Sequence, residues 1–145
     1  MKMYFEELEI GMSVETKSAV IDKEKMLDFA REYNPAPIHT DEEYAKNTRF
    51  GRLIAPGVMA FMAVWAKYIE VDFFGDELIA GKSTSIEWFA PVFAEDVLTG
   101  KAKVTALIPR NPYNGIAEIT MEIYNDREEL VMNSVTEAIV KRKPQ

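Results

Sequence analysis

The sequence contains no cysteine and only one histidine, His39. The missing cysteines exclude disulfide scaffolds, thiolate zinc sites, iron–sulfur clusters and cysteine nucleophiles, and they suit a reducing compartment. A single histidine also excludes a metal site built from several imidazoles, and no cluster of carboxylates offers oxygen ligands instead. We therefore expect chemistry that uses neither a metal nor a redox cofactor.

Basic residues are also few, with 17 Lys and Arg against 24 Asp and Glu, so that the formal net charge is −7. This balance disfavours an extended surface for nucleic acid or anionic membranes. The longest apolar stretch, Leu53 to Ala66, is shorter than the roughly 18 residues that a spanning helix needs. Residues 1–7 show no apolar segment of a secretory signal. The sequence thus predicts a cytoplasmic protein with no nucleic-acid and no membrane partner.

Helix signals are concentrated in the first half of the chain. Asp22 is a candidate N-cap for a helix over Lys23–Tyr33, where apolar residues recur on one face. Thr40 and Glu43 form a capping-box pattern before a short helix over about 41–47. A third helix is expected to begin at the Pro56-Gly57 step. It is apolar on every side, which predicts a central helix wrapped by the rest of the protein.

The second half of the chain changes to the two-residue alternation of β-strands. Asn114-Gly115 and Asn125-Asp126 are the expected turns. Gly81-Lys82-Ser83-Thr84 resembles the end of a phosphate-binding loop, but the preceding glycine and the following helix are missing, so a strand is predicted there. With early helices and a late antiparallel sheet, the chain is expected to form one α+β domain over residues 1–145. The expected strands cover Met12–Val20, 101–108, 117–123 and Leu130–Lys141.

His39 and Gly57 are the two candidate functional positions. His39 follows a loop stiffened by Pro35 and Pro37, and such loops often carry function; alternatively, its ring could hold the start of the next helix by packing on Tyr44. Gly57 opens a helix whose first N–H groups lack partners and could hold an oxyanion; alternatively, glycine merely allows close approach of the backbone. The aromatic and methionine side chains of 58–65 are expected in the core.

Three segments of the sequence carry a family resemblance: Asn34-Pro-Ala-Pro-Ile-His39-Thr-Asp, Arg49-Phe-Gly-Arg-Leu-Ile-Ala-Pro-Gly57 and Trp88-Phe-Ala-Pro-Val-Phe-Ala-Glu-Asp96. Together they resemble the MaoC-like acyl dehydratases, which include the (R)-specific enoyl-CoA hydratases. The resemblance implies a hot-dog fold, in which a curved antiparallel sheet wraps around one long central helix. The architecture derived from periodicity agrees with this expectation.

The resemblance also implies roles for individual residues. In such enzymes an Asp five residues before a His holds a water between the two side chains, and a backbone N–H at the start of the central helix polarises the thioester carbonyl. His39 and Gly57 match, while the Asp position falls on Asn34. A gapped alignment would bring in Glu32 instead, but Glu32 lies within a helical pattern, so the ungapped alignment is favoured. The expected substrate contacts are Pro37, Ala55, Pro56 and Val58.

These residues imply an acyl-thioester hydratase or dehydratase that acts on an enoyl or 3-hydroxyacyl group carried by CoA or an acyl carrier. An amide orients water but accepts no proton, so Asn34 also favours an alternative, a protein that binds acyl-CoA with little or no turnover. Thioester hydrolysis is a third possibility, which the lack of a well-placed carboxylate disfavours.

The last expectation concerns assembly and charge. A hot-dog unit leaves one sheet edge unpaired, and the resemblance implies a homodimer or higher homo-oligomer that covers apolar residues around Phe89–Phe93. The anionic end of CoA would need local cations in this acidic chain. The candidates are Arg49, Arg52, Lys82 and Lys101.

Overall fold

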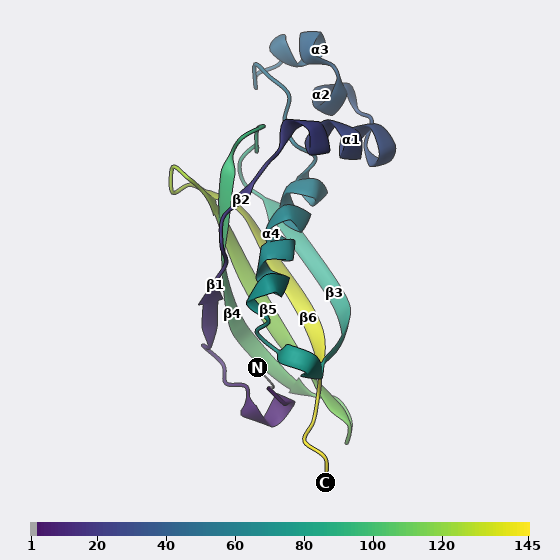
Figure 1. Cartoon of the computed structure of the whole chain (residues 1–145), viewed down its shortest axis with the longest axis vertical. Helices are drawn as coiled ribbons and strands as arrows, with labels where there is room; N and C mark the ends of the chain where they lie inside the picture. Colours follow the sequence, from purple (N-terminus) through teal and green to yellow (C-terminus); the bar gives the residue numbers. More distant parts are fainter. Residues whose placement is uncertain (1–2) are drawn as a thin grey trace.

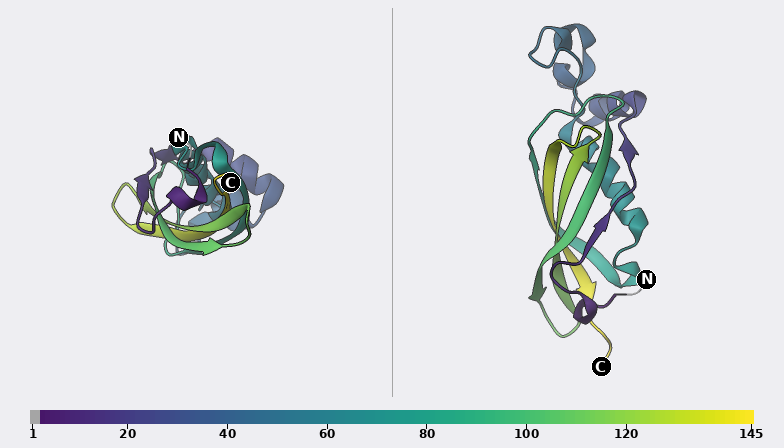
Figure 2. Two further views of the ribbon diagram at one scale, coloured as in Figure 1. Left: turned by 90° about the horizontal axis from the view of Figure 1, so that it is seen from below. Right: turned by 90° about the vertical axis from the view of Figure 1, so that its left-hand side faces the viewer.

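The computed structural model describes residues 3–145 and shows a curved antiparallel sheet around one long helix, α4 (Gly57–Val71) (Figure 1). The strands run in the order β1-β4-β5-β6-β3, and a further strand, β2, pairs with β4. Seen along the long axis, the sheet curves around α4 (Figure 2, left). This is the α+β hot-dog architecture that the sequence predicts. The strands are β1 (Ser13–Glu15), β2 (Ala19–Val20), β3 (Leu78–Trp88), β4 (Val97–Pro109), β5 (Asn114–Asn125) and β6 (Leu130–Lys141).

Three short helices gather at one end of the sheet, above the start of α4 (Figure 1). They are α1 (Lys23–Tyr33), α2 (Pro37–Thr40) and α3 (Glu42–Lys46), and two 3-10 turns complete the set, η1 (Phe5–Glu7) and η2 (Gly75–Glu77). The bounds predicted for α1 are confirmed, and the Asp22 carboxylate accepts a hydrogen bond from the Lys25 backbone N–H at 3.0 Å. No helix among residues 3–145 has the length and apolarity to cross a membrane.

The core lies between α4 and the concave face of the sheet. Alternate residues of β5 point into it, and Ala117, Ile119, Met121 and Ile123 are all buried. Gly100 of β4 lets the helix come close, because a Cβ there would lie 2.9 Å from Val64 Cγ1. The alternation that predicts β5 therefore follows from one face packing against α4.

The prediction that α4 is buried on every side is wrong for the single chain. Its inward face is buried through Ala60, Phe61, Val64 and Tyr68. Val58, Met62 and Ile69 are about half exposed and recur at helical spacing on another face. The sheet covers only one side of α4 (Figure 2, right), so this apolar stripe stays open in the single chain.

The predicted capping box at Thr40 and Glu43 is also wrong. Pro37 starts an additional helical turn, α2, and Thr40 lies within it, where its hydroxyl donates to the Ala36 carbonyl at 3.2 Å. The cap of α3 is Asp41, whose carboxylate accepts from the Tyr44 backbone N–H at 3.1 Å. The next helix therefore begins one residue later than predicted.

Several strand boundaries differ from the sequence prediction, and β4 begins at Val97 rather than at residue 101. Asn114-Gly115 is not the turn but the start of β5, because Asn111 shapes the preceding turn by accepting from the backbone N–H groups of Tyr113 and Asn114. The expected strand over Met12–Val20 is split into β1 and β2. The turn at Asn125-Asp126, the bounds of β6 and the strand character of 81–84 are confirmed.

Candidate functional site

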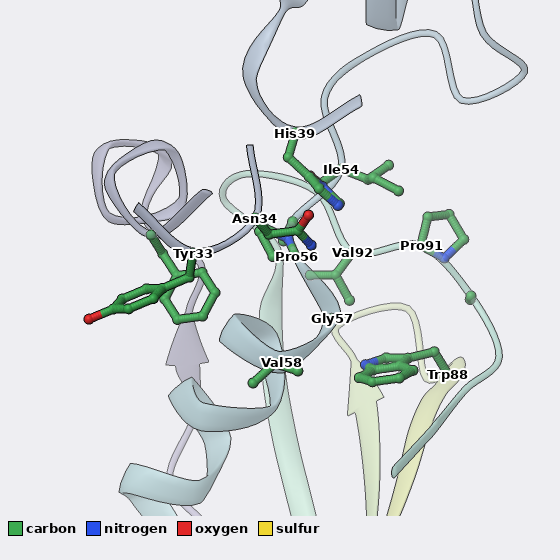
Figure 3. A pocket seen from close by; sticks show the side chains of 13 residues that line it. Tyr33, Asn34, His39, Ile54, Pro56, Gly57, Val58, Trp88, Pro91 and Val92 are labelled. Carbon is green, nitrogen blue, oxygen red and sulfur yellow. The ribbon is translucent and has the colours of Figure 1, made fainter. Parts of the chain in front are cut away.

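A pocket of about 660 Å³ opens at the first turn of α4 (Figure 3). Four stretches of chain meet there: the end of α1, helix α2, the segment into α4, and the end of β3 with the residues after it. Every site residue predicted from the sequence lines the pocket except Pro37, which is exposed at the start of α2. The lining residues are Phe29, Tyr33, Asn34, His39, Ile54, Ala55, Pro56, Gly57, Val58, Trp88, Ala90, Pro91 and Val92.

His39 is fixed in the wall of this pocket. Only 9% of the residue is exposed, and Nδ1 lies 2.8 Å from the Ile54 carbonyl oxygen. A carbonyl oxygen only accepts, so Nδ1 carries the hydrogen and donates it. In the neutral ring, Nε2 then keeps a free lone pair that can accept a proton.

The alternative structural role for His39, packing on Tyr44, does not fit these contacts. The ring is tied to the segment before α4, and the Tyr44 side chain is about half exposed. The backbone strengthens the same link, because the Ile54 N–H donates to the Ile38 carbonyl at 3.3 Å. Helix α2 therefore positions His39 over the start of α4.

Asn34 ends α1 and reaches the pocket from the opposite side. Its backbone N–H donates to Ala30, and its amide side chain extends toward the His39 ring in Figure 3. Glu32, the candidate from a gapped alignment, is an exposed residue of α1 and does not line the pocket. The geometry therefore brings an amide, not a carboxylate, to the histidine.

Gly57 has the local geometry that both interpretations of its sequence position need. Its N–H belongs to the first turn of a 15-residue helix, where N–H groups lack intrahelical partners and the helix dipole is positive. No side chain caps this end. A Cβ on Gly57 would also lie 2.6 Å from Trp88 Nε1, so only glycine allows the indole to approach this closely.

Sequence reasoning missed two parts of the site. The Ile54 carbonyl orients His39 from 15 residues away, and a backbone group has no sequence signal. Trp88 opens one of the three segments that carry the family resemblance, but the sequence assigns it no role in the site. Neither contact is local, so neither could be inferred from spacing.

The pocket wall is mostly apolar and carries little charge. None of its lining residues within 3–145 is acidic, and no group of three potential metal ligands occurs in the same part of the chain. None of the predicted CoA-binding cations lines the pocket, and each has a contact of its own elsewhere. Arg49 and Arg52 stack on Phe50 and Phe93, Lys82 lies 3.4 Å from Glu137, and Lys101 lies over Tyr124.

The model of the MaoC like domain matches residues 6–123, most of the chain. The chain belongs to the MaoC-like domain family. Within this family, the uncharacterized protein YdeM of Bacillus subtilis is 31% identical over 141 residues, which cover 97% of this chain and 100% of YdeM.

Two solved structures extend the MaoC-like assignment. A monoamine oxidase regulatory protein from Archaeoglobus fulgidus superposes with a TM-score of 0.93 at 26% identity, over 99% of this chain and 97% of the other. An (R)-hydratase from A. caviae involved in PHA biosynthesis superposes with a TM-score of 0.72 at 28% identity, over 94% and 98%. The family match and the likeness to an (R)-hydratase support a hydratase or dehydratase family for this MaoC-like chain.

Proposed function

We propose that the protein hydrates 2-enoyl thioesters, and dehydrates 3-hydroxyacyl thioesters in reverse, with the acyl group carried by CoA or an acyl carrier. The observation that carries the proposal is the free Nε2 of His39 in the same apolar pocket as Gly57 and Asn34. A buried base, a helix N-terminus and a group that can hold water are the parts that this chemistry needs. No metal or redox cofactor is required.

In the dehydration direction, His39 Nε2 takes the proton at C2, next to the carbonyl. The electrons of that C–H bond move toward the carbonyl oxygen, and the Gly57 N–H stabilises the enolate that results. The C3–O bond then breaks as the C2=C3 double bond forms. The leaving hydroxide takes the proton back from the His39 imidazolium and departs as water, oriented by the Asn34 amide.

Because position 34 is an asparagine, both proton transfers of the reaction are assigned to His39. An amide donates and accepts hydrogen bonds but exchanges no proton in the reaction, so His39 both removes and returns the proton. The same residue supports a second candidate function, acyl-CoA binding without turnover, because no lining residue within 3–145 supplies a carboxylate.

Spectrophotometric hydration of crotonyl-CoA and longer enoyl-CoAs tests the proposal. His39→Ala is expected to lower the rate by about 10²–10⁴-fold, the usual contribution of a general base. Equal rates for wild type and His39→Ala across the panel would rule the hydratase out. Saturable binding without turnover, together with activity gained in Asn34→Asp, would select the binding protein, and release of free CoA thiol would indicate hydrolysis.

We also propose that the protein is a cytoplasmic homodimer joined along β3. That strand has a sheet neighbour on one side only, and an exposed edge of 11 residues favours pairing with a second copy. The open stripe of Val58, Met62 and Ile69 on α4 supplies apolar surface for the same contact. Phe89, which is half exposed after β3, is expected to be covered as well.

A further inference from the structure

The indole of Trp88 lies directly against the start of α4. A Cβ added to Gly57 would be 2.6 Å from Trp88 Nε1 and 2.8 Å from Cζ2, so the face of the indole near its nitrogen lies against the glycine (Figure 3). Trp88 is the last residue of β3 and lies far from Gly57 in the sequence. Both residues line the candidate pocket, and 46% of Trp88 is exposed.

The contact brings two N–H donors together. A Cβ lies about 2.5 Å from the backbone nitrogen of its own residue, so the Gly57 and Trp88 nitrogens are at most about 5 Å apart. An oxygen that accepts from two donors at about 2.9 Å each spans a separation of up to about 5.8 Å. The separation of the two nitrogens therefore allows one oxygen atom to lie within hydrogen-bond distance of both.

Neither donor is used elsewhere within the described residues. The Gly57 N–H is in the uncapped first turn of α4. The indole N–H of Trp88 has no acceptor within residues 3–145 and, with its side chain half exposed, is free to exchange water for a ligand oxygen. An indole nitrogen only donates, so the ligand atom that satisfies it must be an acceptor.

We propose that Trp88 Nε1–H is a second donor to the acyl carbonyl oxygen, acting beside the Gly57 N–H. This inference rests on the proposed function, since it assigns the oxygen to a thioester. Negative charge develops on that oxygen in the enolate, and preorganised donors in a water-poor pocket stabilise it more than the ground-state carbonyl. The wall of the pocket thereby takes a direct part in the reaction. Position 57 supplies its backbone N–H, and glycine is required there because a Cβ would displace the indole.

Trp88→Phe removes the N–H and keeps an aromatic ring, and Trp65→Phe is the matched control, because Trp65 packs on Phe61 and Tyr68 away from the pocket lining. The probes are butyryl-CoA and S-butyl-CoA, a thioether that lacks the carbonyl. Wild type is expected to prefer the carbonyl-bearing probe. Trp88→Phe should reduce this affinity ratio about 3- to 10-fold, while Trp65→Phe leaves it unchanged. If Trp88 contacts the ligand without donating a hydrogen bond, Trp88→Phe would change the affinities for both probes together. The affinity ratio would then stay as in wild type, and this result would overturn the inference.

Turnover separates this inference from the proposed function. If wild type hydrates crotonyl-CoA, Trp88→Phe should lower kcat by about 10-fold or more with KM changed much less, as expected for a donor that acts on developing charge. Turnover by wild type with an unchanged affinity ratio in Trp88→Phe rejects the second donor alone. Failure of wild type to bind either probe rejects both proposals for CoA thioesters, whereas probe binding with the expected ratio but no turnover supports the donor and rejects the hydratase.

Discussion

Strands β3 and β5 have almost the same length, 11 and 12 residues, and both lie antiparallel next to β6. Their environments are opposite. β5 has β4 on its other side and buries alternate side chains beneath α4, whereas β3 has no second neighbour among the described strands and is exposed along nearly all of its length. Two strands of similar length therefore differ in whether their side chains are buried or exposed, and the position of each strand in the sheet determines this.

The difference shows where stability and function are separated in this fold. β5 holds the core together, while β3 ends in Trp88 at the pocket and offers its free edge to a partner. β3 is paired with β6 along its backbone, and side-chain contacts such as Ser83 Oγ to the Glu137 carboxylate at 2.6 Å add to that pairing. Its register with β6 shifts twice between Leu78 and Ser83, which bends the edge. A change in β5 should therefore act on folding, and a change in β3 on assembly and on the site.

The largest expected effect comes from truncating equivalent side chains in the two strands. Ile123 in β5 is fully buried, so Ile123→Ala should lower the free energy of unfolding by about 2–5 kcal/mol. Ile79 in β3 is 54% exposed, so Ile79→Ala should change it by less than about 0.5 kcal/mol. Urea denaturation at one fixed protein concentration compares them. Equal losses would contradict the assignment of stability to the central strands.

The next largest difference in stability is expected between alanine substitutions of two glycines, one in β4 and one in β3. A Cβ at Gly100 of β4 would lie 2.8 Å from Met121 Sδ and 2.9 Å from Val64 Cγ1, so Gly100→Ala should overpack the core and cost about 1–3 kcal/mol. Around Gly81 of β3 nothing lies within 4 Å, so Gly81→Ala should be neutral or slightly stabilising. Thermal unfolding monitored by circular dichroism measures both variants. A destabilised Gly81→Ala would mean that the proposed partner copy fills the space beside β3 and leaves no room for a methyl group.

The parts of the fold with one clear periodicity were predictable from the sequence. Helix α1 and strand β6 have the predicted bounds because each presents one face to the core and has a polar boundary. The errors lie where two local signals competed. Asp41 rather than Thr40 caps α3, since the proline-initiated turn α2 already includes Thr40, and Asn111 rather than Asn114 shapes the turn before β5.

The candidate site was predictable where its residues lie in segments with a local sequence signal, namely the proline-containing segment after α1 and the start of α4. His39, Asn34 and Gly57 come from two such segments, and the pocket brings them together. Trp88 and the Ile54 carbonyl were not, because their contacts depend on how β3 meets α4 and how α2 meets the segment before it. The half-exposed face of α4 was missed for a related reason: composition shows that a helix is apolar, not how much of it a single chain covers.

The proposed dimer predicts a smaller effect on association. Met62 is half exposed on the open stripe of α4, so Met62→Lys would place an ammonium in an apolar contact and should weaken dimerisation by at least about tenfold. Ile10→Lys adds the same charge at an exposed residue before β1 and is the control. Sedimentation at micromolar concentration should show more monomer for Met62→Lys only. An unchanged association constant would remove α4 from the interface.

The smallest effect is expected where β3 is attached to β6. The Ser83 hydroxyl donates to Glu137, and this hydrogen bond, followed by the charge of Lys82, holds the pKa of the Glu137 carboxyl below its usual value of 4.5. A carboxyl whose pKa is lowered by folding stabilises the folded state above its unfolded pKa, and that contribution is lost as pH falls through the lowered folded value. Glu137→Gln should therefore lower Tm at pH 7 by no more than about 2 °C, because exposed pairs contribute little, and should match wild type in acid. Glu87→Gln, at an exposed carboxylate of the same edge strand, should leave Tm unchanged at both pH values. A Tm difference between Glu137→Gln and wild type that persists at low pH would show that the contribution of Glu137 to stability does not depend on its negative charge.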